Sequence, residues 1–276
     1  MLPSGNHELS EEHVKIICPI KRVPDTAATK HLDPADNTVD RGRSDPVLNA
    51  NDEWAIEEAL QLAERTPDTE IIALCMGPDE AGTTVRKALS YGLDGAIHIV
   101  DPAVAGSDAV ATARVLAGAL ADTDFDAIIM GNQSSDARTM LVPAMLAEFL
   151  GVPALTYVRD LQVDGDVFTA QRETAAGHVE VRATGPLVVS VVEAINEPRY
   201  PTFKGIMAAK KKPVDQRDLA AVGVEEGQVG LTGSHTAIVE VTPRPPKEAG
   251  RTVDDDGSGA VGAKALADWL VERKIL

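Results

Sequence analysis

The residues with the clearest chemical potential form a polar loop at positions 131–142, whose first nine residues read Gly-Asn-Gln-Ser-Ser-Asp-Ala-Arg-Thr. The loop follows an apolar run typical of a buried strand and leads into a helical pattern. Its backbone N–H groups therefore lie at a helix N-terminus, where anions bind. Side-chain donors are added by Ser134, Ser135, Arg138 and Thr139. This pattern predicts a phosphate site, and the plainer interpretation is a polar helix cap without a ligand.

A second segment, residues 196–212, is basic in an otherwise acidic chain. Two prolines favour an extended backbone, Phe203 and Met207 are apolar residues in a polar setting, and cations gather at Arg199, Lys204 and 210–212. A solvated basic face is the ordinary interpretation of a lysine run. An aromatic residue flanked by charges is better suited to docking, because the aromatic ring supplies affinity and the charges steer the partner.

The other motifs in the sequence do not indicate a catalytic, metal or dinucleotide site. The one G-x-G-x-x-G pattern, at 257–262, follows three aspartates instead of a strand, so we reject it as a dinucleotide fingerprint. The sequence has no P-loop, H-E-x-x-H or C-x-x-C pattern, and its six histidines are scattered, so we expect no metal site. Cys18 and Cys75 each lie in an apolar run, which favours buried core residues over a disulfide.

The polar loop needs a scaffold, and the chain from Val14 to about Gly151 predicts one. Short β-rich runs alternate there with helical periodicity, which indicates a parallel α/β sheet. Ligands of such sheets bind at the carboxyl ends of the strands, where the polar loop is expected. The expected strands are 14–20, 71–76, 95–100 and 125–130, and the expected helices are 52–65, 79–91, 108–121 and the stretch that ends at Leu150.

The sequence pattern changes after Pro153. Four β-like runs, at 154–161, 167–172, 178–183 and 187–192, predict antiparallel strands that extend the same sheet. The basic segment, a glycine-rich stretch and a final helix near 263–274 complete the chain.

Composition excludes several classes of protein. The 276 residues carry 43 acidic and 26 basic side chains, a formal charge of −17, and only nine aromatic rings. A nucleic-acid-binding protein needs cationic side chains and usually aromatic side chains that stack on bases, so we do not expect this protein to bind nucleic acid. No apolar run approaches the roughly 20 residues of a membrane span. The first 13 residues are polar and acidic, unlike a secretory signal, and we expect a cytoplasmic protein.

The basic segment, with its Asn196-Glu-Pro-Arg-Tyr-Pro-x-x-x-Gly-Ile-Met207 motif and the lysines at 210–212, resembles the β subunit of electron transfer flavoproteins. The resemblance is collinear from about Val14 to the end of the chain. Its other motifs are Lys21-Arg-Val-Pro-Asp25, Asn49-x-x-Asp52-Glu-x-Ala55-x-Glu57-Glu-Ala59-Leu60, Gly77-Pro78, Arg86-Lys-Ala88-Leu89, Gly131-x-Gln133 and Arg251-Thr252.

The resemblance implies a fold and a function. The fold is a mainly parallel, doubly wound sheet of the nucleotide-binding, universal-stress-protein-like type, with added antiparallel strands and a C-terminal arm that wraps an α subunit. The heterodimer holds FAD mostly through the α subunit and binds AMP structurally in the β subunit. It carries electrons from acyl-CoA or related flavoprotein dehydrogenases, as in fatty acid β-oxidation, to a membrane quinone oxidoreductase. The β subunit is a carrier and not an enzyme, because the flavin performs the redox chemistry.

The resemblance also assigns residues. The nucleotide pocket, for AMP or FAD, comprises Pro19, Asn49, Ala50, Asn51, Asp52, Met76, Gly131, Asn132, Gln133, Ser134, Ser135, Asp136, Ala137, Arg138, Thr139, Met140, Leu141 and Val142. Partner contacts are expected at Arg199, Tyr200, Phe203, Lys204, Ile206 and Met207, with Phe203 where the family usually carries Leu. Glu173 matches a glutamate that helps to hold the mobile flavin domain. The expected divisions are a variable or disordered N-terminus at 1–13, the α/β domain at 14–195, the partner-recognition segment at 196–212, and an extension at 213–276 that contacts the α subunit.

The polar loop departs from the family pattern. The family continues with paired Asp and then Asn-Gln-Thr or Gln-Val-Gly, whereas this chain loses side-chain donors at Met140, Leu141 and Val142 and gains the cation Arg138. That cation suits a more phosphorylated nucleotide. Two alternatives therefore stay open: an electron-bifurcating subunit that binds a second FAD and receives hydride from NAD(P)H, and a stand-alone nucleotide-binding regulatory module.

Overall fold

The computed structural model describes residues 13–242, 245 and 250–276. The expectation for residues 1–13 therefore lies, except for His13, outside the described residues. The described chain forms two compact units that divide between Ile238 and Val239.

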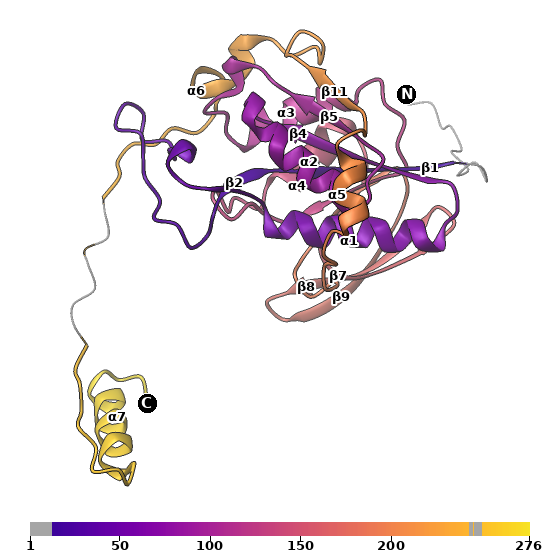
Figure 1. Cartoon of the computed structure of the whole chain (residues 1–276). Coiled ribbons are helices and arrows are strands. Elements are labelled where there is room, and N and C mark those ends of the chain that lie inside the picture. Colours follow the sequence, from indigo (N-terminus) through magenta and orange to yellow (C-terminus); the bar gives the residue numbers. More distant parts are fainter. Residues whose placement is uncertain (1–12, 243–244, 246–249) are drawn as a thin grey trace. The chain divides into compact units, whose positions relative to one another are not determined.

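A mainly parallel sheet forms the centre of the first unit (Figure 1). Its strand order is β11-β5-β4-β1-β6-β10-β7-β8-β9. All pairs from β11 to β7 are parallel, whereas β7, β8 and β9 pair antiparallel. This confirms the parallel core with antiparallel additions. The strands are β1 (Val14–Ile20), β4 (Thr69–Met76), β5 (Gly95–Ile99), β6 (Ala127–Gly131), β7 (Ala154–Asp164), β8 (Val167–Thr174), β9 (Gly177–Thr184), β10 (Leu187–Val191) and β11 (Val214–Arg217).

The predicted direction of two strands was wrong. The runs at 154–161 and 187–192 were expected to be antiparallel additions, but β10 lies between β6 and β7 and pairs with both in parallel. Every residue of β10 is buried, as a continuous apolar run in a parallel sheet covered on both faces requires. The antiparallel part begins only where the later half of β7 pairs with β8.

Helices cover both faces of the sheet. Neighbouring residues of β1 show this, because Ile16 packs into one buried cluster with α1 and α2, and Ile17 packs into another with α3 and α4. Alternate side chains of one strand thus face two cores, which confirms the doubly wound architecture. The helices are α1 (Ala50–Arg65), α2 (Gly82–Tyr91), α3 (Ala109–Leu120) and α4 (Val142–Leu150), with a short α6 (Gly230–Gly233) later in the chain.

Three smaller features complete the description. A two-stranded sheet joins β2 (Arg22–Pro24) to β3 (Pro46–Leu48). The second unit contains α7 (Ala260–Glu272), which has no buried residue. Cys18 and Cys75 are buried free thiols, as predicted. Across the part of the chain that the structure describes, no helix is both long and apolar enough to cross a membrane.

The basic segment is extended only in its first part. Residues 203–209 form the short helix α5 (Phe203–Ala209), which lies beside α2 (Figure 1). Thr202 begins this helix, because its side-chain oxygen accepts a hydrogen bond from the N–H of Gly205 at 3.0 Å. The expectation of a wholly extended segment was therefore wrong, since the prolines at 198 and 201 both precede the cap.

Candidate functional site

The polar loop leaves the sheet at the end of β6, beside the start of α1. Gly131 makes this approach possible, because a Cβ there would lie 2.7 Å from atoms of both Asn51 and Asp52. That distance is far inside ordinary contact, so a larger residue would separate the strand from the helix. The carboxyl edge of the sheet thus brings the two halves of the predicted pocket together.

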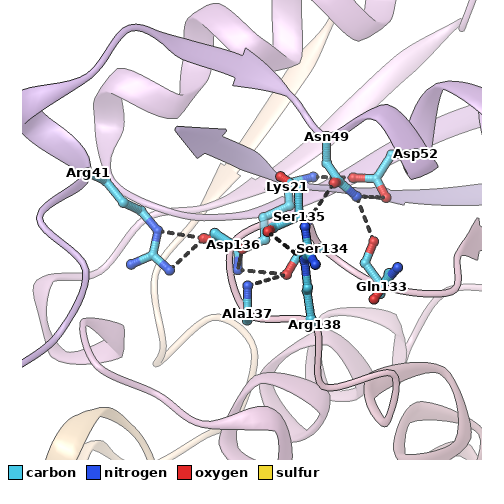
Figure 2. A network of polar contacts seen from close by, with 10 residues as sticks. All are labelled: Lys21, Arg41, Asn49, Asp52, Gln133, Ser134, Ser135, Asp136, Ala137 and Arg138. Carbon is cyan, nitrogen blue, oxygen red and sulfur yellow. Dashed lines mark hydrogen bonds and ion pairs between the residues drawn. The ribbon is translucent and has the colours of Figure 1, made fainter. Parts of the chain in front are cut away.

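Asn49 joins α1 to the polar loop (Figure 2). Its Nδ2 donates to Asp52 Oδ1 at 2.8 Å and to the carbonyl oxygen of Gln133 at 2.9 Å. Its Oδ1 accepts from the N–H of Ser135 at 3.0 Å. Asn49 precedes the first helical residue, yet its side chain makes no capping bond to the backbone of α1 and instead joins the Asp52 side chain to the loop. Four residues assigned to the pocket are therefore held in one network.

A charged cluster fixes the middle of the loop. Asp136 Oδ1 lies 2.8 Å from Lys21 Nζ, and Asp136 Oδ2 lies 2.7 Å from Arg41 Nη2 (Figure 2). The Asp136 side chain is 1% exposed, whereas both cations remain partly exposed. Burial alone would raise the pKa of Asp136, but the charges of Lys21 and Arg41 hold this pKa well below its ordinary value. Two cations thus meet one carboxylate, which leaves the cluster positive.

The loop backbone then turns sharply before α4. Arg138 and Met140 have positive φ angles of 52° and 57°, and Leu141 returns to the right-handed helical region. A left-handed residue next to a right-handed one points successive N–H groups into a shared concavity that binds anions. Within the described residues, the N–H groups of Thr139, Met140 and Leu141 donate no backbone hydrogen bond. The backbone therefore supplies donors where the side chains of the loop have lost them.

Asp52 lies buried beneath this site at the start of α1. Its Oδ2 accepts from the N–H of Lys21 at 2.8 Å, and its Oδ1 accepts from Asn49. Burial raises the pKa of Asp52 to about 7, against the opposing effect of these hydrogen bonds. The site therefore contains a carboxyl group that titrates near neutral pH.

The remaining predicted pocket residues lie around the same edge. Pro19 is buried near the end of β1, Met76 ends β4, and Ala50 is the first residue of α1. Ala137, Arg138, Thr139, Met140 and Leu141 are exposed along the loop, and Val142 begins α4. No group of three or more His, Cys, Asp or Glu side chains in the described ranges is arranged to hold a metal ion.

Sequence reasoning missed two cations of the site. Lys21 belongs to the motif that follows the first strand, so its place at a carboxyl end was available as a signal. Arg41 lies in the long loop between β2 and β3, and nothing local indicates that it reaches Asp136. The contact joins residues 95 positions apart, which no spacing rule could supply.

A cavity of about 630 Å³ adjoins the polar loop at Asn132 and Gln133. It lies between the first turns of α1, the end of β10 and the β8–β9 hairpin, and Glu173 is in its wall. Asn51 Nδ2 donates to Asn132 Oδ1 at 2.6 Å, and Gln133 Oε1 is buried without a hydrogen-bond partner. The residues that line the cavity include Asn51, Trp54, Asn132, Gln133, Tyr157, Glu173 and Glu193.

The basic segment presents apolar side chains to solvent. Tyr200 is 91% exposed and Phe203 is 80% exposed, and Ile206 and Met207 are also exposed. Arg199 differs from its predicted companions, because its guanidinium binds Glu57 and Glu64 of α1. Lys204 is exposed. The structure thus places five of the six predicted contact residues at the surface and the sixth within the chain's own network.

Comparison with known proteins gives the family. The model of the electron transfer flavoprotein domain matches residues 36–222. The electron transfer flavoprotein subunit beta of Mycobacterium tuberculosis is 42% identical over 266 residues, which cover 95% of this chain and 99% of the relative. This chain belongs to the electron transfer flavoprotein family, as a β subunit.

Two further relatives show the breadth of this β-subunit family. The electron transfer flavoprotein subunit beta of Megasphaera elsdenii is 37% identical, over 95% of this chain and all of the relative. Subunit CarD of the caffeyl-CoA reductase-Etf complex of Acetobacterium woodii is 30% identical, over 95% of this chain and all of the relative. Membership makes this chain a component of an electron transfer flavoprotein, which implies association with flavin and with an α subunit. The alignment spans the sheet, the polar loop and the basic segment alike.

Proposed function

We propose that this β subunit forms a heterodimer with an electron transfer flavoprotein α subunit and carries electrons from flavoprotein dehydrogenases to a membrane quinone oxidoreductase. It acts in the cytoplasm as a carrier and not as an enzyme, because the FAD bound mostly by the α subunit changes redox state. Acyl-CoA dehydrogenases, as in fatty acid β-oxidation, are the proposed donors. The observation that carries the proposal is the exposure of Phe203 and Tyr200 on the basic segment, whose motif resembles the partner-recognition segment of β subunits.

AMP is the proposed structural ligand of the polar loop. The concave backbone at Met140 and Leu141 supports a phosphate there, because its N–H groups are free of backbone partners. Lys21, Arg41 and Arg138 add positive charge around it. The adenosine part would lie toward Pro19, Met76 and the Asn49–Asp52 turn, at the carboxyl edge of the parallel strands.

Residues outside the α/β domain (14–195) are proposed to contact the partners. The basic segment at 196–212 docks dehydrogenases, and the extension at 213–276 contacts the α subunit. The apolar side chains of α7 support the second assignment, because Val261, Leu266 and Trp269 are exposed in their own unit. Glu173, in the wall of the cavity beside the polar loop, is proposed to contact the mobile flavin domain.

A direct test is to purify the chain alone and together with its α subunit. We expect the chain alone to release no stoichiometric FAD and the heterodimer to be yellow, with one FAD. Mass spectrometry of the nucleotides released from the heterodimer should find AMP. Stoichiometric FAD on the isolated chain would contradict the proposal.

A bifurcating subunit is the second candidate function, and the positive cluster favours it. A second FAD in place of AMP brings a pyrophosphate, and the two cations paired with Asp136, together with the exposed Arg138 on the same loop, suit that greater charge. One relative belongs by name to a caffeyl-CoA reductase-Etf complex. Two FAD per heterodimer, with reduction by NAD(P)H, would establish this candidate, and one FAD with one AMP would reject it.

A further inference from the structure

The basic segment is fastened to α1 by an ion pair. Arg199 donates from Nε to Glu57 Oε2 at 2.7 Å and from Nη2 to Glu57 Oε1 at 2.9 Å, and its backbone N–H reaches Glu57 Oε2 at 3.1 Å. The remaining guanidinium nitrogen, Nη1, donates to Glu64 Oε1 at 2.6 Å. Three donors of one residue thus converge on one carboxylate, and such a forked arrangement fixes orientation as well as distance.

A second contact repeats this pattern three residues earlier. Asn196 Nδ2 donates to Glu58 Oε2 and to the backbone oxygen of Trp54, each at 3.1 Å. Glu57 and Glu58 are both buried, so the segment covers two acidic side chains of α1. A buried carboxylate is costly unless it is paired, and an apolar residue would pack there at less cost. On α1 itself Glu57 accepts one hydrogen bond, from Gln61 at 3.0 Å, and Glu58 lies 3.8 Å from Arg65, so the segment supplies most of the pairing that Glu57 has.

The far end of the segment is fastened to α2. Arg86 Nη1 donates to the carbonyl oxygens of Ala209 at 2.8 Å and Lys212 at 2.7 Å. Lys212 Nζ in turn donates to the carbonyl oxygens of Gly92 and Leu93. Gly205 packs so closely that a Cβ would lie 2.4 Å from the carbonyl oxygen of Ser90. Helix α5 is thus held at both ends while Phe203 stays exposed.

We infer that Glu57 is the positioning residue of the docking surface: by holding Arg199, its carboxylate fixes Tyr200 and Phe203 in the geometry that a dehydrogenase binds. The inference rests on the proposed docking function. Its physical content is preorganisation, because a segment already ordered before encounter loses less conformational entropy on binding. Glu57 lies on α1, away from the exposed face, so it acts through Arg199 and not by touching the partner.

The test compares Glu57→Gln with Glu64→Gln in the purified heterodimer. Both changes remove one negative charge from the same guanidinium, but Glu64 is 60% exposed and holds one nitrogen only. With a purified acyl-CoA dehydrogenase as electron donor, E57Q should raise the apparent KM about tenfold with kcat within twofold, and E64Q should leave both within twofold. Native-state trypsin cleavage in the segment should accelerate about tenfold in E57Q only, because cleavage reports local opening.

Phe203→Ala separates the possible failures. If F203A leaves the apparent KM unchanged, the docking function itself is wrong. If F203A raises the KM and E57Q changes neither KM nor cleavage, the docking function stands and the positioning role of Glu57 is wrong. The apparent KM of the double variant E57Q/F203A should lie within twofold of that of F203A. An apparent KM raised by the product of the two single effects would also overturn the inference, because the two residues would then act independently.

A second variant covers the case in which E57Q yields no folded heterodimer. Arg199→Lys keeps the charge but loses the fork, because an ammonium is a point charge without fixed planar geometry. It should raise the KM in the same direction by about threefold, with FAD content equal to wild type. A loss of FAD in parallel with the KM effect would show a general structural role and overturn the inference.

Discussion

Lys21 and Asp136 form an ion pair, with 2.8 Å between Nζ and Oδ1, across 115 positions of the sequence. The pair ties the residue that follows β1 to the loop that follows β6, and these two strands are neighbours in the sheet. Arg41 binds the other oxygen of the same carboxylate. The shape of the polar loop is therefore set by charge as well as by the hydrogen bonds of Asn49.

Replacing Asp136 should destabilise the heterodimer measurably. Asp136→Asn leaves Lys21 and Arg41 facing each other without a counter-charge. Breaking a buried pair costs about 3–5 kcal/mol, and the partial exposure of both cations reduces this to about 1–3 kcal/mol. Urea denaturation checks the value, with the exposed Asp122→Asn as the control. Because the folded-state pKa of Asp136 is depressed, the difference should shrink as the pH falls below about 4.

Asp52 should make stability depend on pH near neutrality. Its folded-state pKa of about 7 lies above its ordinary value of 3.8, so the folded protein binds one more proton than the unfolded chain between these values. Stability then falls as the pH rises from about 4 to 7, by about 1.4 kcal/mol for each unit of the pKa difference. Urea midpoints at pH 5 and pH 8 should differ less in Asp52→Asn than in wild type. An equal slope in both proteins would contradict the shift.

Arg138 should strengthen nucleotide binding through its charge. Arg138→Asn removes the cation while an asparagine still accepts the positive φ of 52°. Affinity for the released nucleotide, measured by calorimetry on the stripped heterodimer, should fall about threefold to tenfold at low salt, and less at high salt because the charge is exposed. Arg138→Lys keeps the charge and serves as the matched control. An equal loss in both variants would indicate a backbone effect in place of charge.

Phe203 should govern partner docking without affecting the fold. The side chain is 80% exposed, so Phe203→Ala should change the free energy of unfolding by less than about 0.5 kcal/mol. The apparent KM for a dehydrogenase should rise about tenfold, as for the loss of an aromatic hot spot. Val179→Ala on β9, another exposed apolar position, is the control. Loss of FAD in F203A would mean that the segment is structural.

Much of the fold was predictable because its pattern is local. Alternating apolar runs and helical periodicity indicated the parallel sheet, and the strand at 14–20 matches β1 without a change of bounds. The position of β10 was not predictable, because strand order depends on which edges meet and not on the run itself. Helix α5 escaped notice because seven residues that include a glycine carry too weak a periodic signal.

The site was predictable where it is continuous in sequence. The polar loop and the Asn49–Asp52 turn were both indicated, and Asn49 joins them. The long-range contacts of Arg41 and Glu57 were not. Glu57 and Glu58 belong to α1, which begins at Ala50, and both carboxylates are buried against the basic segment. Charge alone does not reveal a partner that lies more than 130 residues away.

Helix α1 meets the polar loop at its first turn, through Asp52 and the preceding Asn49, and meets the basic segment about one and a half turns after Asp52, through Glu57. An α-helix turns by about 100° for each residue. One residue inserted between Asp52 and Glu57 would rotate the Glu57 carboxylate by that angle about the helix axis, away from Arg199, while Asn49 kept its position. The number of residues between these points is therefore as constrained as their identity, and a chimera that exchanges either surface with a relative must preserve the length and phase of this helix.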